Sequence, residues 1–298
     1  MLTRSLQHAL WFAMLLVLAS GARASDFGQG LLWRIEPPNG AAASHLFGTI
    51  HLDDVRVVRR VDAVRGTLED AQRFAMEMVT DADSAAIFAA AATLPAGQHL
   101  GDLVGADYPA LEALLRNRYG IPPYQTERMA PWLAYVTLNL PGPRTGYILD
   151  ELLHILAQRR GLPVSGLEPV EAQIAAMTAL SPAQQTALLL AALREHDAVL
   201  AGVETLVQLY LAEDLDAMAG LQDASLERHP QLAEAHTALL EHVLYRRNPG
   251  MAQRAAALAD AGGAFMAVGA LHLHGPRGLL ALLQQAGYGI SRVPLRTD

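Results

Sequence analysis

The chain has 298 residues, of which 52% are hydrophobic, which is enough for one large domain or two small ones. It has no cysteine, which excludes disulfides and cysteine-bound zinc, so any metal would bind through histidine, carboxylate or amide groups, which suit manganese, cobalt, zinc or iron. The net charge is −8, all 22 basic residues are arginine, and no basic run is interleaved with aromatic residues, so we expect no nucleic-acid partner.

Residues 1–24 have the features of an export signal. Arg4 supplies a positive charge, residues 9–19 form an apolar run, and Ala-Arg-Ala at 22–24 matches a cleavage site made of small residues. We therefore predict a signal peptide over 1–24 and a periplasmic or secreted mature protein; an uncleaved anchor or a buried helix is the alternative. No later segment has the roughly 18 uninterrupted apolar residues of a membrane helix, so we expect no stable membrane span after cleavage.

The mature chain begins with strand-like segments. Residues 30–36 alternate, a Pro-Pro-Asn-Gly turn follows, and residues 44–51 have the pattern of a second strand, which predicts a hairpin. Valine and leucine then recur at helical spacing over 53–70. The next apolar run, 73–79, has the character of a buried strand, and it carries one acid, Glu77.

Helices dominate the middle of the chain. We expect helices over 84–139, interrupted at glycine and proline, and over 150–160. A short strand over 164–167 follows and delivers Glu168 at its end. An alanine- and leucine-rich helical region then extends over 181–245. This stretch is therefore expected to form a largely helical lobe.

The last part of the chain alternates again between helices and strands. A helix is expected over 251–261, a strand over 264–270, a helix over 278–286 and a last strand over 289–293. The strand at 264–270 is followed closely by His272. Strands are therefore expected at both ends of the chain, with helices between them.

This arrangement predicts an α/β fold with a central mixed β-sheet built from the N- and C-terminal segments and flanked by helices. No low-complexity linker divides the chain. We therefore predict a single domain over 25–298, with a helical middle insert at about 84–160 and 181–261.

Two segments at opposite ends of the chain repeat one pattern. Residues 46–52 have the sequence LFGTIHL and residues 267–273 have AVGALHL, each with glycine, two residues, histidine and leucine after an apolar run. Glycine allows a turn or a close approach where the strand ends, and chemistry in α/β folds is placed at such ends. If the two ends meet in one sheet, His51 and His272 form a candidate metal or acid–base site. The alternative is two histidines that happen to end strands.

Three further positions carry candidate chemistry. A carboxylate in an apolar strand is costly to bury unless it is paired or bound to metal, which favours a functional Glu77 over a surface position on an edge strand. Glu168 ends a strand, but with Glu171 it also fits ordinary chemistry at a helix N-terminus. Arg247, next to Asn248, could stabilise an oxyanion or could simply pair with the helix C-terminal dipole.

Taken together, these motifs resemble the TraB/GumN family, which is related to the Tiki metalloproteases and more distantly to ChaN-like and erythromycin-esterase-like proteins. Their order and spacing cover almost the whole mature chain. The resemblance is carried by FGTIHL at 47–52, Glu77, GLEPVEAQ at 166–173, Arg247-Asn248-x-x-Met251, and VGALHLHGPRGL at 268–279.

The resemblance implies an α/β fold with a sheet from both ends of the chain, and a divalent-metal site of peptidase type. It implies that two histidines bind or flank the metal. It also implies that one glutamate is a ligand or the general base and that the second completes or orients the site. The Arg-Asn pair would hold the substrate or an oxyanion. The implied metal-site residues are His51, His272 and Glu77, and the implied catalytic residues are Glu77, Glu168, Arg247 and Asn248.

Two functions follow as hypotheses. The first is an exported, divalent-metal-dependent hydrolase, a peptidase acting on a peptide or protein substrate. The second is a non-catalytic protein of the same fold that binds a peptide, haem or iron. The substrate, the metal and the oligomeric state are left open by the sequence.

Overall fold

The computed structural model describes residues 27–142 and 146–295, so the predicted signal peptide lies outside the described residues. Its centre is a six-stranded sheet with the strand order β4-β3-β5-β2-β1-β6. The strands are β1 (Leu32–Glu36), β2 (Ser44–Thr49), β3 (Arg73–Met76), β4 (Val164–Gly166), β5 (Ala264–Gly269) and β6 (Gly289–Val293).

The sheet is mixed, as the sequence predicted. Strand β1 is antiparallel to both β2 and β6, which includes the expected hairpin, whereas β2, β5, β3 and β4 run parallel. The fully buried β5 is a continuous apolar run, as expected of a parallel strand covered on both faces, whereas most of the edge strand β6 is exposed. The predicted α/β fold, with a central sheet built from both ends of the chain, is confirmed.

The parallel pairing brings the two glycine-histidine turns together. Gly48 of β2 lies opposite Val268 of β5, and β3 pairs with the other side of β5. Because parallel strands end at the same edge of a sheet, the segments that follow β2, β3, β4 and β5 gather at one place. Segments more than 200 residues apart in sequence, such as those carrying His51 and His272, therefore meet there.

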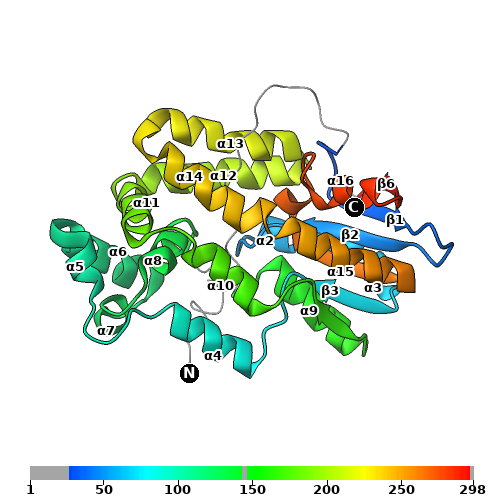
Figure 1. Cartoon of the computed structure of the whole chain (residues 1–298), viewed down its shortest axis with the longest axis horizontal. Coiled ribbons are helices and arrows are strands. Elements are labelled where there is room, and N and C mark those ends of the chain that lie inside the picture. Colours follow the sequence, from blue (N-terminus) through cyan, green and yellow to red (C-terminus); the bar gives the residue numbers. More distant parts are fainter. Residues whose placement is uncertain (1–26, 143–145, 296–298) are drawn as a thin grey trace.

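Helices flank this sheet. Helix α9 contacts β3, β4 and β5, while α15 contacts β5 and α16 contacts β6. Figure 1 shows the sheet at the right of the view, with α15 passing in front of it. The helices nearest the sheet are α2 (Val55–Val58), α3 (Arg60–Glu69), α9 (Leu149–Arg159), α10 (Val170–Thr178), α15 (Asn248–Ala261) and α16 (Leu279–Gln285).

The remaining helices form the lobe at the left and top of Figure 1. Helices α8 and α11 pack together within it, and α12 packs against α13. The lobe helices are α4 (Ala82–Ala91), α5 (Leu100–Val104), η1 (Gly105–Asp107), α6 (Tyr108–Tyr119), α7 (Pro123–Thr126), α8 (Pro131–Leu138), α11 (Pro182–Arg194), α12 (His196–Leu211), α13 (Leu215–Arg228), η2 (Pro230–Leu232), α14 (Ala233–Leu240) and the π-helix η3 (Glu241–Tyr245).

Several local expectations differ from the structure. The strand expected over 73–79 ends at Met76, so Glu77 lies just after β3 and not within a strand. The helix expected over 53–70 is divided into α2 and α3 at Arg59. The strand expected over 264–270 ends at Gly269, and His272 lies on a 3-10 turn, η4 (Ala270–His272). After Gly269, whose N–H donates to the Glu77 carboxylate, the chain turns, and the Leu273 N–H donates to the Ala270 carbonyl within this turn.

No single helix within residues 27–142 and 146–295 combines the length and apolar character needed to cross a membrane. Helices α10 and α11 meet that test only when they are counted together across a bend of 81°.

Candidate functional site

His51 follows β2 and is held by a buried carboxylate. Its Nδ1 lies 3.0 Å from Oδ2 of Asp150, at the start of α9, and the other oxygen of Asp150 accepts a hydrogen bond of 2.6 Å from the Thr49 hydroxyl. We assign the Nδ1 proton on this contact. Nε2 of His51 then faces Oε1 of Glu77 at 3.8 Å.

His272 is held by an amide instead. Its Nδ1 contacts Oδ1 of Asn248, the first residue of α15, and the Asn248 amide donates to the carbonyl of Arg277 at 2.7 Å. Nε2 of His272 lies 3.6 Å from Oε1 of Glu77 and has no hydrogen-bond partner among the described residues. A buried polar atom without a partner is rare and calls for an explanation.

Glu77 stands between the two imidazoles. Its Oε1 accepts a 2.7 Å hydrogen bond from Gly269 N–H, and its Oε2 accepts one of 2.7 Å from Arg247. Burial raises the pKa of this carboxyl, but the His272 imidazole, the Arg247 guanidinium and the other neighbours outweigh it and hold the pKa at about 2. Because His272 is itself uncharged near neutral pH, we attribute the ionisation of Glu77 mainly to Arg247.

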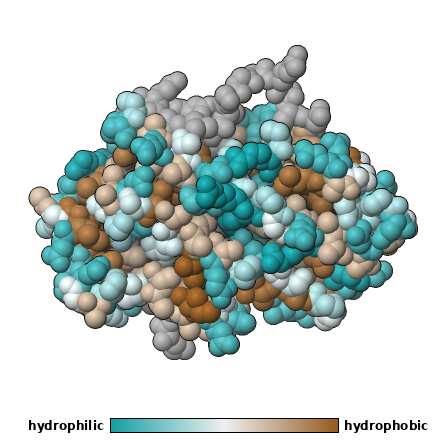
Figure 2. All heavy atoms as spheres, in the orientation of Figure 1, coloured by the Kyte–Doolittle hydropathy of each residue, from teal (hydrophilic) through white to brown (hydrophobic). Residues whose placement is uncertain are grey.

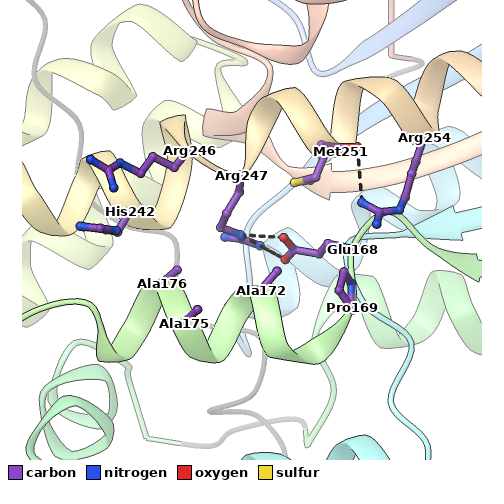
Figure 3. A pocket seen from close by; sticks show the side chains of 11 residues that line it. Glu168, Pro169, Ala172, Ala175, Ala176, His242, Arg246, Arg247, Met251 and Arg254 are labelled. Atoms are coloured by element: carbon purple, nitrogen blue, oxygen red, sulfur yellow. Dashed lines mark hydrogen bonds and ion pairs between the residues drawn. The ribbon is translucent and has the colours of Figure 1, made fainter.

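Arg247 joins two carboxylates. Its Nε lies 3.1 Å and 3.0 Å from the two oxygens of Glu168 (Figure 3). Its Nη2 donates to both Glu77 and Glu168. Burial raises the pKa of Glu168 despite this guanidinium. The single positive charge of Arg247 is therefore shared by two buried carboxylates, and it can balance only one of their two negative charges.

The two histidines differ in their protonation. Burial lowers the pKa of His51, but the adjacent Asp150 carboxylate outweighs it, so the pKa is raised. Burial dominates for His272 and lowers its pKa to about 3. His51 is therefore suited to carry a proton, whereas His272 stays a neutral imidazole near neutral pH.

The cluster has part of the chemistry that a metal site needs. Within residues 27–142 and 146–295, no group of three or more histidine, aspartate and glutamate side chains is already arranged to hold one. The unpartnered Nε2 of the neutral His272, beside an ionised carboxylate, nevertheless has the chemistry of a ligand for zinc or a similar divalent ion. Asp150 and Asn248 hold the far nitrogens of the two rings, as outer partners do in histidine metal sites.

The structure thus brings the sequence-predicted residues into one cluster. Within the cluster, Arg247 contacts two carboxylates, and Asn248 contacts His272 and a backbone carbonyl. The clustered residues are His51, Glu77, Glu168, Arg247, Asn248 and His272.

Sequence reasoning missed Asp150 and Thr49. Asp150 is only 1% exposed, yet an acid in the first turn of a helix also fits ordinary helix-dipole chemistry, so its position drew no attention. The available signal was its place between Leu149 and Glu151 at the start of an amphipathic helix. Thr49 had a signal as well, since it lies inside the first glycine-histidine motif.

Comparison with known proteins places the chain in a family. The model of the TraB/PrgY/gumN family matches residues 31–292. The chain is also similar to a protein from Danio rerio named Metalloprotease TIKI2, with 26% identity over 314 aligned positions that cover 88% of this chain. The match spans 61% of the length of that relative. Since the family match includes the sheet and every residue of the cluster, the chain belongs to the TraB/PrgY/gumN family.

Proposed function

We propose that this protein is a metal-dependent hydrolase, a peptidase that acts on peptide or protein substrates in the periplasm or outside the cell. The observation that carries the proposal is the approach of both Nε2 atoms, from His51 and His272, to within 3.8 Å and 3.6 Å of one oxygen of Glu77. The similarity to a relative named a metalloprotease supports metal dependence.

In this proposal His51 and His272 hold a divalent ion, which is manganese, cobalt, zinc or iron, and Glu77 is either the third ligand or the general base. Such an ion lowers the pKa of a bound water towards about 7 and polarises a carbonyl. Asp150 and Asn248 orient the two imidazole rings from behind.

The other charged groups supply proton transfer and charge stabilisation. The raised pKa of Glu168 makes this carboxylate more basic, which suits a group that accepts a proton from water. Arg247 is directed at both glutamates, so a developing oxyanion near it would take over hydrogen bonds that a carboxylate now accepts.

The test compares the wild-type chain with the double variant H51A/H272A. Cleavage of a fluorogenic peptide library, with Mn²⁺, Co²⁺, Zn²⁺ or Fe²⁺ added in turn, should be lost in the double variant, while circular dichroism shows that the variant keeps its secondary structure. The matched control is H99A, because His99 is partly exposed and pairs with Glu127 in the helical lobe. Unchanged turnover in the double variant would reject the proposal.

The alternative of a non-catalytic binding protein makes a different prediction. Elemental analysis and a visible spectrum of the purified chain would then show haem or iron without any cleavage of the library. A divalent ion without a chromophore, together with cleavage, supports the hydrolase instead.

A further inference from the structure

A pocket of about 410 Å³ adjoins the buried cluster. It lies between α10 on one side and the junction of η3 with α15 on the other, and Glu168 and Arg247 form part of its wall (Figure 3). In the same orientation as Figure 1, Figure 2 shows hydrophilic residues gathered in the middle of this face, where α14 ends and α15 begins. The pocket is therefore an open neighbour of the proposed catalytic centre.

Its lining has an uneven charge. His242 comes from η3, Arg254 from α15, and Arg246 and Arg247 from the junction between these two elements. Helix α10 contributes small alanine side chains that leave room. The only carboxylate in the lining is that of Glu168, which already pairs with Arg247. In a chain of net charge −8, this is a local concentration of positive charge.

Two of the arginines retain capacity for a ligand. Arg254 donates to the carbonyls of Leu167 at 3.1 Å and Gly250 at 3.5 Å, and no carboxylate pairs with it among the described residues. The side chain of Arg246 is 63% exposed, and its Nε lies 3.5 Å from Glu241. Glu241, however, accepts two shorter hydrogen bonds, of 2.8 Å and 2.9 Å, from Arg277.

The backbone geometry accounts for the position of Arg246. The segment η3 is a π-helix, in which Arg246 N–H donates to the Glu241 carbonyl five residues earlier at 2.9 Å. Such segments recur at functional sites because they change the direction of the following side chains. Here one arginine, Arg246, lines the open pocket, and the next, Arg247, reaches the buried carboxylates.

We propose that this pocket binds a carboxylate of the substrate, supplied by an acidic side chain or by the free C-terminus of a peptide. The proposal rests on the proposed function, because it names the substrate class for that site. A guanidinium donates two parallel hydrogen bonds to a carboxylate, and charge-assisted hydrogen bonds of this kind are strong. The pocket shares Glu168 and Arg247 with the cluster, so the adjoining part of a bound peptide lies against that centre.

The experiment measures binding, with three fluorescein-labelled alanine hexapeptides as probes. One has an amidated C-terminus, one has a free C-terminal carboxylate, and one is amidated but contains a single glutamate. Fluorescence polarisation is recorded with the full-length H51A/H272A chain, in which the proposed cleavage is removed, and with the wild type. We expect at least one charged peptide to bind about tenfold more tightly than the neutral one, and the peptide that does so identifies the source of the carboxylate.

The variants show whether the pocket causes this preference. In R246Q/R254Q the preference should fall below about threefold, whereas R65Q should keep it, because Arg65 pairs with Asp62 on α3 and does not line the pocket. The single charge reversal R246E, at a partly exposed position, should weaken binding of the charged peptides even if the double variant folds poorly. Equal binding of all three peptides, or a preference that survives R246Q/R254Q and R246E, would overturn the proposal.

The binding readout separates this inference from the proposed function. A charge preference without any cleavage activity would leave the carboxylate subsite standing and reject the hydrolase. Cleavage activity without a charge preference would reject the subsite alone.

Discussion

The two histidines of the cluster differ in what stands behind each ring. His51 has a charged carboxylate, Asp150, at its Nδ1, whereas His272 has the neutral amide of Asn248. The carboxylate favours a protonated imidazole and the amide does not, so the pKa is raised for His51 and lowered to about 3 for the buried His272. Two nearly identical sequence motifs thus carry histidines that differ in their protonation.

Asp150 is expected to be a positioning residue. In D150N the His51 ring loses its charged partner, and we expect kcat/KM for metal-dependent cleavage to fall about 10- to 100-fold, the usual cost of removing an outer partner of a metal-binding histidine. Steady-state kinetics measure this, and the pH profile should shift because the pKa of His51 falls without the carboxylate.

The control for D150N is E151Q, on the same helix. Burial lowers the pKa of His154, and Glu151 opposes this only in part. His154 lies outside the cluster, so neutralising Glu151 should leave kcat/KM within about twofold of the wild type. Equal losses in D150N and E151Q would mean that a general change in α9, and not the contact with His51, affects catalysis.

At the scale of elements, the site depends on how closely β2 packs against the turn η4. A Cβ at Gly48 would lie 2.8 Å from Cδ1 of Leu273, 3.0 Å from Cα of Ala270 and 3.1 Å from its Cβ. The glycine therefore permits the close approach that brings the turn carrying His272 beside the end of β2.

We expect G48A to lower the free energy of unfolding by about 1–3 kcal/mol, because the new methyl overpacks this contact. The matched substitution is G66A in α3, where a Cβ meets nothing within 4 Å and the helix favours alanine. G66A should raise the free energy of unfolding by about 0.5–1 kcal/mol. Urea unfolding of the two variants measures both values, and changes of the same sign would contradict the packing argument.

His236 of helix α14 makes the free energy of unfolding depend on pH. His236 is buried, its Nδ1 has no hydrogen-bond partner among the described residues, and burial, aided by His229, lowers its pKa to about 4. As the pH falls, His236 takes up a proton near pH 6.5 in the unfolded chain, and only at a lower pH in the folded chain. The contribution to stability is therefore present above about pH 6.5 and is lost progressively as the pH falls towards about 4.

Denaturation of the wild type and H236F at a series of pH values checks this sign. The difference in unfolding free energy between the two should change between about pH 6.5 and 4, with the wild type losing more stability on acidification. Parallel curves across that interval would show that His236 does not titrate differently in the folded chain.

At the scale of the whole molecule, Arg247 connects the sheet with the helices. From the residue before α15 it contacts Glu77 after β3, Glu168 after β4, and the carbonyl of Val243 in η3 at 2.6 Å. A single guanidinium thus links two strand ends and the helical segment that leads into the pocket.

We expect R247M to lower the free energy of unfolding by about 3–5 kcal/mol, since it leaves two buried carboxylates without their cation. R246M, at the neighbouring and mostly exposed arginine, should change it by no more than about 0.5 kcal/mol. Urea denaturation gives both values. A small loss in R247M would mean that the carboxylates take up protons or find other partners.

Much of the architecture could be predicted from local patterns. The hairpin at the start of the chain, the apolar strand before His272 and the helical middle follow from side-chain periodicity, which is a property of neighbouring residues. The same holds for the cluster residues, because an acid inside an apolar strand or a repeated glycine-histidine motif is visible without a structure.

The partners of those residues required the tertiary structure. Asp150 holds His51, Asn248 holds His272, and one arginine contacts two glutamates. These contacts depend on the register of the parallel strands and on helices that are far away in sequence. Sequence by itself determined the fold class and the residues suited to chemistry, because both depend on short-range patterns. Only the folded chain decided which protons, charges and open space each of these residues has, because hydrogen bonds and burial join segments more than 200 residues apart.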